Sequence, residues 1–216
     1  MKLILCSEGF YTEEIVKKCE EFVGKSRNSI NIAVINEAYA VEHDNNLRWI
    51  LENLNTVKNN FGGNLELINL LALDKETVKK RIELSDAIFV VGGHARYLMS
   101  VFNKTGFDKL LPDLLKTKVY VGSSAGSMVT GKLLSSEAYE KIYGEKDDYG
   151  VKKYLELVNV AIMPHLDSQY FPNRKETLFE AAKKHQGVIY GLRDDTAIIA
   201  EDEKLYTIGS QPLIIS

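Results

Sequence analysis

Short apolar runs that suit β-strands alternate with amphipathic stretches that suit helices along most of this sequence. The helical patterns lie between consecutive strand runs, and Thr12 and Asp44 are candidate N-caps for the first two of them. This alternation predicts a mostly parallel sheet covered by helices on both faces. The predicted strands are 3–5, 30–35, 65–70, 87–91 and 118–121, and the predicted helices are 12–23, 45–61, 75–84, 95–102 and 107–115. A chain of 216 residues can bury one such core, so we expect a single α/β domain over 1–216.

The pattern is less regular in the second half of the chain. A helix is predicted over 125–134, and a run over 157–163 is expected to rejoin the sheet. Between them, 135–154 mixes tyrosines with charges and glycines, so a flap beside a site and a solvated surface excursion both stay open. Further on, 173–184 is amphipathic, and several short β-rich runs follow Val188.

Composition excludes several classes of protein. The formal net charge is -3 and the basic residues are dispersed, which argues against a nucleic-acid partner. No apolar run approaches membrane-spanning length, and the apolar start is short and soon followed by acidic residues, so we expect a buried first strand in a cytoplasmic protein. Cys6 and Cys19 lack metal-binding spacing and are expected to be reduced structural thiols. No metal or organic cofactor is expected.

The strand run 118–121 leads into Gly122-Ser123-Ser124-Ala125-Gly126, a G-x-S-x-G sequence. A strand that reverses sharply into a helix at such a motif projects its central serine from a tight turn, beside the free N–H groups of the helix start. We therefore interpret Ser124 as a nucleophile, in preference to a packing turn or a passive anion-binding helix start. A serine in that role needs a base and donors for the oxyanion.

The sequence offers four histidines as the base. His165 follows the apolar run 161–164 and is expected at the rim of the sheet, where sites of open α/β folds gather. His94 competes with it, because it follows Gly92-Gly93 at another strand end. His43 and His185 lie in polar, helix-flanking sequence and are expected to be solvated.

A catalytic imidazole needs a carboxylate that fixes its tautomer. Asp194 and Asp195 lie between two apolar runs and could reach the rim, although taken alone they suit a charged turn. Asp167 is close to His165 in sequence but local, and Glu137 follows the predicted elbow helix and suits a solvated surface position. The sequence leaves these alternatives open.

Four motifs in chain order resemble the serine peptidase family that contains dipeptidase E (aspartyl dipeptidase) and cyanophycinase. They are a Gly-Gly loop after a strand, the G-x-S-A-G elbow, Pro164-His165 at a strand end, and Asp194 two positions before Thr196-Ala197. The resemblance implies Ser124 as nucleophile, His165 as base, Asp194 as third member, and the N–H groups of Gly93 and Ala125 as oxyanion hole. It also implies a flavodoxin-like sheet similar to that of the class I glutamine amidotransferases. The chain departs from the family pattern at His94-Ala95, where Asn-Thr is frequent, and at Asp194, where Glu is common.

The function that follows is a serine peptidase that hydrolyses short peptides through an acyl-enzyme, as a monomer or homodimer. Dipeptidase E prefers an N-terminal aspartate, a preference that no residue here indicates directly. Arg174 and Arg96 are candidates for binding a substrate carboxylate, against the alternative that both are solvated. The other open functions are a non-catalytic module that binds a small anion and an esterase with the same nucleophile. The order Ser, His, Asp along the chain would exclude an ordinary α/β-hydrolase.

Overall fold

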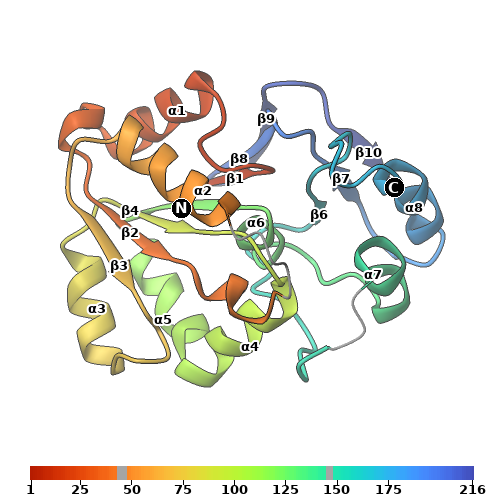
Figure 1. The fold of residues 1–216 in the computed structure, drawn as a ribbon, viewed down its shortest axis with the longest axis horizontal. Coiled ribbons are helices and arrows are strands. Elements are labelled where there is room, and N and C mark those ends of the chain that lie inside the picture. Colours follow the sequence, from red (N-terminus) through yellow and green to blue (C-terminus); the bar gives the residue numbers. More distant parts are fainter. Residues whose placement is uncertain (43–47, 145–147) are drawn as a thin grey trace.

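The centre of the molecule is a seven-stranded sheet with the strand order β3-β2-β4-β5-β1-β8-β9. The computed structural model describes residues 1–42, 48–144 and 148–216 (Figure 1). Strands β3, β2, β4, β5 and β1 are parallel to one another, whereas β8 pairs antiparallel with both β1 and β9. The strands are β1 (Lys2–Cys6), β2 (Ile32–Ile35), β3 (Leu65–Ile68), β4 (Ala87–Val90), β5 (Val119–Ser123), β8 (Ala197–Glu201) and β9 (Lys204–Ile208). The predicted mostly parallel sheet is confirmed.

Helices cover both faces of this sheet, as predicted (Figure 1). Helices α1 (Glu13–Val23) and α2 (Arg48–Asn60) lie on one face, and α3 (Lys75–Glu83), α4 (Ala95–Thr105) and α5 (Phe107–Leu114) on the other. Alternate side chains of a strand point to opposite faces. In β1, Leu3 and Leu5 therefore pack into the α3–α5 core while Ile4 and Cys6 pack into the α1–α2 core.

The helix starts follow the sequence where the structure describes them. Thr12 caps α1 as predicted, since its side-chain oxygen accepts a hydrogen bond from the Ile15 N–H at 3.4 Å. The described part of the second helix begins at Arg48. The predicted cap Asp44 and the candidate base His43 lie outside the described residues.

Two predictions for the second half of the chain are wrong. The helix predicted over 125–134 is only α6 (Ala125–Met128), because the chain then turns to pair with another segment: the Lys132 N–H donates to the Val160 carbonyl at 2.8 Å. The run 157–163 does not rejoin the large sheet. It yields only β6 (Ala161–Met163), in a second sheet with the order β10-β7-β6, formed with β7 (Ile189–Gly191) and β10 (Leu213–Ile215). Strand β6 pairs in parallel with β7, whereas β1 has β5 and β8 as its neighbours.

Helices α7 (Ser136–Tyr143) and α8 (Arg174–Ala182) lie together beside the small sheet (Figure 1). Tyr139 and Tyr154 are only 1% and 3% exposed, so the described part of 135–154 is no solvated excursion. Short 3₁₀ turns occur at η1 (Arg27–Ser29) and η2 (Glu37–Val41). Among the described residues, every helix is too short or too polar to cross a membrane.

Candidate active site

The serine elbow has the strand, sharp turn and helix that its motif predicts. Ser124 lies between β5 and α6 with φ 49° and ψ -111°, a backbone conformation that a serine rarely adopts. Its N–H donates to the carbonyls of Cys6 at 3.1 Å and Ser7 at 3.0 Å, which fixes the turn against the end of β1. The turn is tight enough that a Cβ at Gly126 would lie 2.1 Å from the Val90 carbonyl oxygen. The surrounding backbone thus holds Ser124 in its strained conformation.

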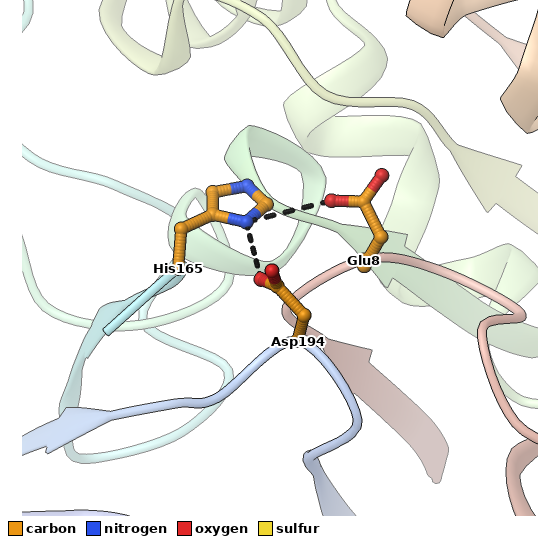
Figure 2. Close-up of side chains that lie close together, drawn as sticks. All are labelled: Glu8, His165 and Asp194. Carbon is orange, nitrogen blue, oxygen red and sulfur yellow. Dashed lines mark hydrogen bonds and ion pairs between the residues drawn. The ribbon is translucent and has the colours of Figure 1, made fainter. Parts of the chain in front are cut away.

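The small sheet brings His165 and Asp194 together. His165 follows β6 and Asp194 follows β7, and these two strands are parallel neighbours, so both residues leave the sheet at one edge. His165 Nδ1 lies 2.6 Å from Asp194 Oδ1, a length typical of a charge-assisted hydrogen bond (Figure 2). Burial by itself raises the pKa of Asp194, but hydrogen bonds from His165 and Ser7 and the charge of His165 lower it below its ordinary value. Asp194 is therefore ionised at neutral pH and can orient the imidazole.

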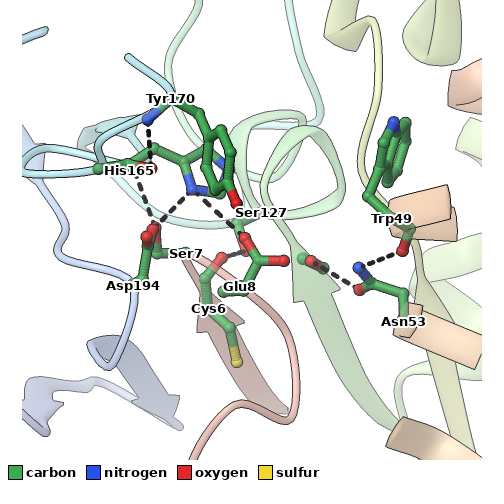
Figure 3. Close-up of polar contacts among 11 residues, drawn as sticks. Cys6, Ser7, Glu8, Trp49, Asn53, Ser127, His165, Tyr170 and Asp194 are labelled. Carbon is green, nitrogen blue, oxygen red and sulfur yellow. Dashed lines mark hydrogen bonds and ion pairs between the residues drawn. The ribbon is translucent and has the colours of Figure 1, made fainter. Parts of the chain in front are cut away.

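Ser7 supports this pair from the end of β1. Its Oγ accepts a hydrogen bond from the His165 N–H at 2.8 Å and donates to Asp194 Oδ1 at 3.1 Å (Figure 3). His165 has φ 62°, a left-handed conformation that favours glycine, and the Ser7 contact helps to hold it there. Sequence reasoning missed Ser7, although its place directly after a buried strand was the same signal that identified His165.

Glu8 is a second carboxylate at the imidazole, and sequence reasoning missed it as well. Its Oε2 lies 3.4 Å from His165 Nδ1 (Figure 2). Burial is the largest cause that raises the pKa of Glu8 above its ordinary value. The charge of His165 and a hydrogen bond with Asn53 lower this pKa, whereas the negative charges of Asp194 and Glu52 raise it.

Glu8, His165 and Asp194 also have the composition of a cation site. One donor atom from each lies within 4.8 Å of the others, which makes them the candidate metal-ligating group of the described part of the chain. His165 Nδ1 and Asp194 Oδ1 are nevertheless at hydrogen-bonding distance, and that contact is the arrangement a general base requires.

The Gly92-Gly93 loop lies directly against the serine. A Cβ at Gly92 would be 3.1 Å from Ser124 Cβ, and Gly93 has a φ of +127°. Ala125 is the first residue of α6, so its N–H has no acceptor within that helix. These positions are compatible with the predicted oxyanion hole of Gly93 and Ala125, which stays a prediction.

The other histidines have different surroundings. His94 is 7% exposed, and its Nδ1 accepts a hydrogen bond from the Tyr97 N–H at 3.3 Å, which caps α4. Its ring also meets that of Tyr149 edge to face, with centroids 5.0 Å apart. His185, expected to be solvated, is partly buried, and burial lowers its pKa.

The alternative acids contact other groups. Asp195 accepts a hydrogen bond from Ser210 Oγ at 2.6 Å, and Asp167 pairs with Arg193 at 2.6 Å. Glu137 pairs with Lys184 at the surface. Of the four acids that the sequence left open, Asp194 is the one whose contact with His165 the structure contains.

Both candidate substrate arginines are buried, contrary to the alternative that they are solvated. Arg96 is 2% and Arg174 5% exposed. The Arg174 guanidinium lies 4.2 Å from the centroid of the Phe171 ring, and that ring stacks on His165 with centroids 5.2 Å apart. The Arg96 guanidinium lies 4.1 Å from the ring centroid of Tyr139. The structure thus places Arg174 one aromatic ring away from the imidazole.

Several known proteins are similar to this chain. The chain is 28% identical over 135 residues to an uncharacterized peptidase of Listeria monocytogenes, and 29% identical over 128 residues to one of Listeria innocua. These matches cover 60% and 57% of this chain and span about three fifths of the relatives, 63% and 59% of their lengths.

Two solved structures share the fold. The crystal structure of a candidate peptidase E protein from Listeria monocytogenes has a TM-score of 0.76 and 21% identity, and covers 97% of this chain and 98% of its own. A peptidase from an acI-B1 actinobacterium has a TM-score of 0.68 and 14% identity, with 100% and 93% covered. The predicted flavodoxin-like, glutamine-amidotransferase-like fold is thereby confirmed. A family model described as peptidase family S51 matches residues 3–208, nearly the whole sequence, and the chain therefore belongs to that family.

Proposed function

We propose that the protein is a serine peptidase that hydrolyses short peptides through an acyl-enzyme on Ser124. The observation that carries this proposal is the 2.6 Å contact of His165 with Asp194 at the strand ends, in a chain whose serine elbow has a strained Ser124. In this mechanism Ser124 Oγ attacks the scissile carbonyl and passes its proton to His165, which then protonates the leaving amine. Asp194 orients the imidazole, and the N–H groups of Gly93 and Ala125 bind the oxyanion. Water then attacks the ester and releases the second product.

We further propose that Arg174 binds an acidic group of the substrate. Its Nη1 is buried and, within the described part of the chain, lacks a hydrogen-bond partner, a state that a carboxylate would relieve. Its guanidinium lies against the Phe171 ring, which stacks on His165, so Arg174 lies close to the proposed base. This supports a preference for an N-terminal aspartate. Arg96, whose guanidinium lies against Tyr139, is the second candidate for binding a substrate carboxylate.

A dipeptide library assayed beside aryl esters tests the reaction. A peptidase cleaves dipeptides and prefers Asp-X over Ala-X, an esterase turns over only the aryl esters, and an anion-binding module hydrolyses neither. Ser124→Ala is the control and should abolish every hydrolysis.

The assignment of Arg174 has its own test. Arg174→Gln should raise KM for Asp-X by about tenfold or more while leaving Ala-X nearly unchanged, because a charge-assisted pair is lost only with the acidic substrate. Equal losses for both substrates would show that Arg174 has a structural role instead.

A further inference from the structure

Two carboxylates converge on one nitrogen of the candidate base. Asp194 Oδ1 lies 2.6 Å and Glu8 Oε2 3.4 Å from His165 Nδ1 (Figures 2 and 3). Asp194 follows β7 of the small sheet, whereas Glu8 follows Ser7 at the end of β1 in the large sheet. The imidazole is thus held by acidic groups from both sheets.

The position of Glu8 is fixed by its neighbours. The Cys6 and Ser7 carbonyls both accept a hydrogen bond from the Ser124 N–H. The backbone directly before Glu8 is therefore fixed to the serine elbow. From α2, Asn53 hydrogen-bonds to Glu8, and the charged Glu52 faces it from the same helix. The Glu8 side chain keeps 33% of its surface exposed, which leaves the carboxylate accessible to protons.

We propose that Glu8 is a positioning residue for the base: Asp194 makes the hydrogen bond to His165 Nδ1, and the negative charge of Glu8 beside the ring helps to stabilise the imidazolium that forms when Ser124 is deprotonated. This inference rests on the proposed function for its catalytic meaning. Asp194 makes the short hydrogen bond, and Glu8, 0.8 Å farther from Nδ1 (3.4 against 2.6 Å), contributes mainly through its charge. An opposite charge at this range favours the protonated form of an imidazole.

The direct test is an NMR titration of the His165 imidazole in protein that carries Ser124→Ala and has been treated with a chelator. Glu8→Gln should lower the midpoint of the His165 titration by on the order of one pH unit. Glu52→Gln is the matched control, because it removes a neighbouring carboxylate that pairs with Arg48 at 2.8 Å, and it should move the midpoint much less. An unchanged midpoint in folded Glu8→Gln protein would overturn the proposal, as would equal shifts from the two variants.

Activity provides the second test. Asp194→Asn should retain residual kcat, since the charge of Glu8 stays beside the imidazole, and adding Glu8→Gln should lower kcat by at least a further tenfold. Identical kcat values for Asp194→Asn and the double variant would contradict the proposal. The NMR titration does not depend on hydrolysis, so a failure of the peptidase assignment, seen as full activity of Ser124→Ala, is distinct from a failure of the Glu8 assignment.

Discussion

His165 carries the candidate chemistry in a backbone conformation that its side chain disfavours. A non-glycine residue at φ 62° costs roughly 1–2 kcal/mol, and the Ser7 and Asp194 contacts offset that cost. The sequence indicated the strand end where His165 lies but not this conformation, because the contacts that impose it come from segments 158 and 29 residues away. For the same reason Asp194 and Asp195 could not be separated from sequence, since the turn after β7 decides which of them faces the imidazole.

The base assignment predicts a specific loss of activity. His165→Ala should lower kcat on the order of a thousandfold or more, because the proposed mechanism passes the Ser124 proton to this imidazole. Activity of the unchanged protein should fall as pH drops, because a protonated imidazole cannot accept the Ser124 proton. Steady-state kinetics across pH measure both effects. His94→Ala is the control, expected to lose some stability of α4 but to keep its turnover; an inactive His94→Ala beside an active His165→Ala would reverse the assignment.

The acid assignment predicts unequal effects from neighbouring residues. Asp194→Asn should lower kcat by at least tenfold and by up to about ten-thousandfold, the loss seen in the best-studied triad. Asp195→Asn should stay close to the unchanged protein, because Asp195 bonds to Ser210 and not to His165. Parallel kcat measurements compare them, and equal mild losses would mean that neither aspartate completes a triad.

At the scale of elements, the strand and helix patterns of the first half were predictable because each element is long and buries one regular face. The pattern failed where backbone pairing, and not periodicity, sets the boundary. Helix α6 stops at Met128, although the apolar residues continue to Leu134, because the following segment bonds to Val158 and Val160. Glycine is required at Gly122 and Gly126 of the elbow because backbone atoms of other residues lie where a Cβ would be.

Gly126→Ala tests that close approach. The added Cβ would lie 2.1 Å from the Val90 carbonyl oxygen, which is backbone and cannot rotate away. We expect a loss of roughly 2–4 kcal/mol in the free energy of unfolding, measured by denaturant titration. Gly106→Ala is a contrasting variant, since its Cβ meets no atom within 4 Å and only its positive φ opposes the change. A smaller loss at Gly126 than at Gly106 would contradict the described turn.

At the scale of the whole molecule, the sequence predicted the parallel sheet and its two helical layers but not the second sheet. The pairing of β6 with β7 joins segments 28 residues apart, as in Ala161 with Ile189, and β10 adds the end of the chain. Local periodicity carries no information about such pairing. It is nevertheless this small sheet that carries His165 and Asp194 to the end of β1, where Ser7 and Glu8 lie. The cytoplasmic location and the oligomeric state stay predictions from the sequence.

The central claim, that Ser124 is an activated nucleophile, is tested most directly by labelling with a fluorophosphonate probe followed by peptide mass mapping. An activated serine should form one phosphonyl adduct on the peptide that contains Ser124. Ser124→Ala should abolish the adduct, whereas Ser123→Ala should retain it, because Ser123 Oγ is buried against Asn53 and not at the turn. An unlabelled native protein, or an adduct that survives Ser124→Ala, would contradict the account.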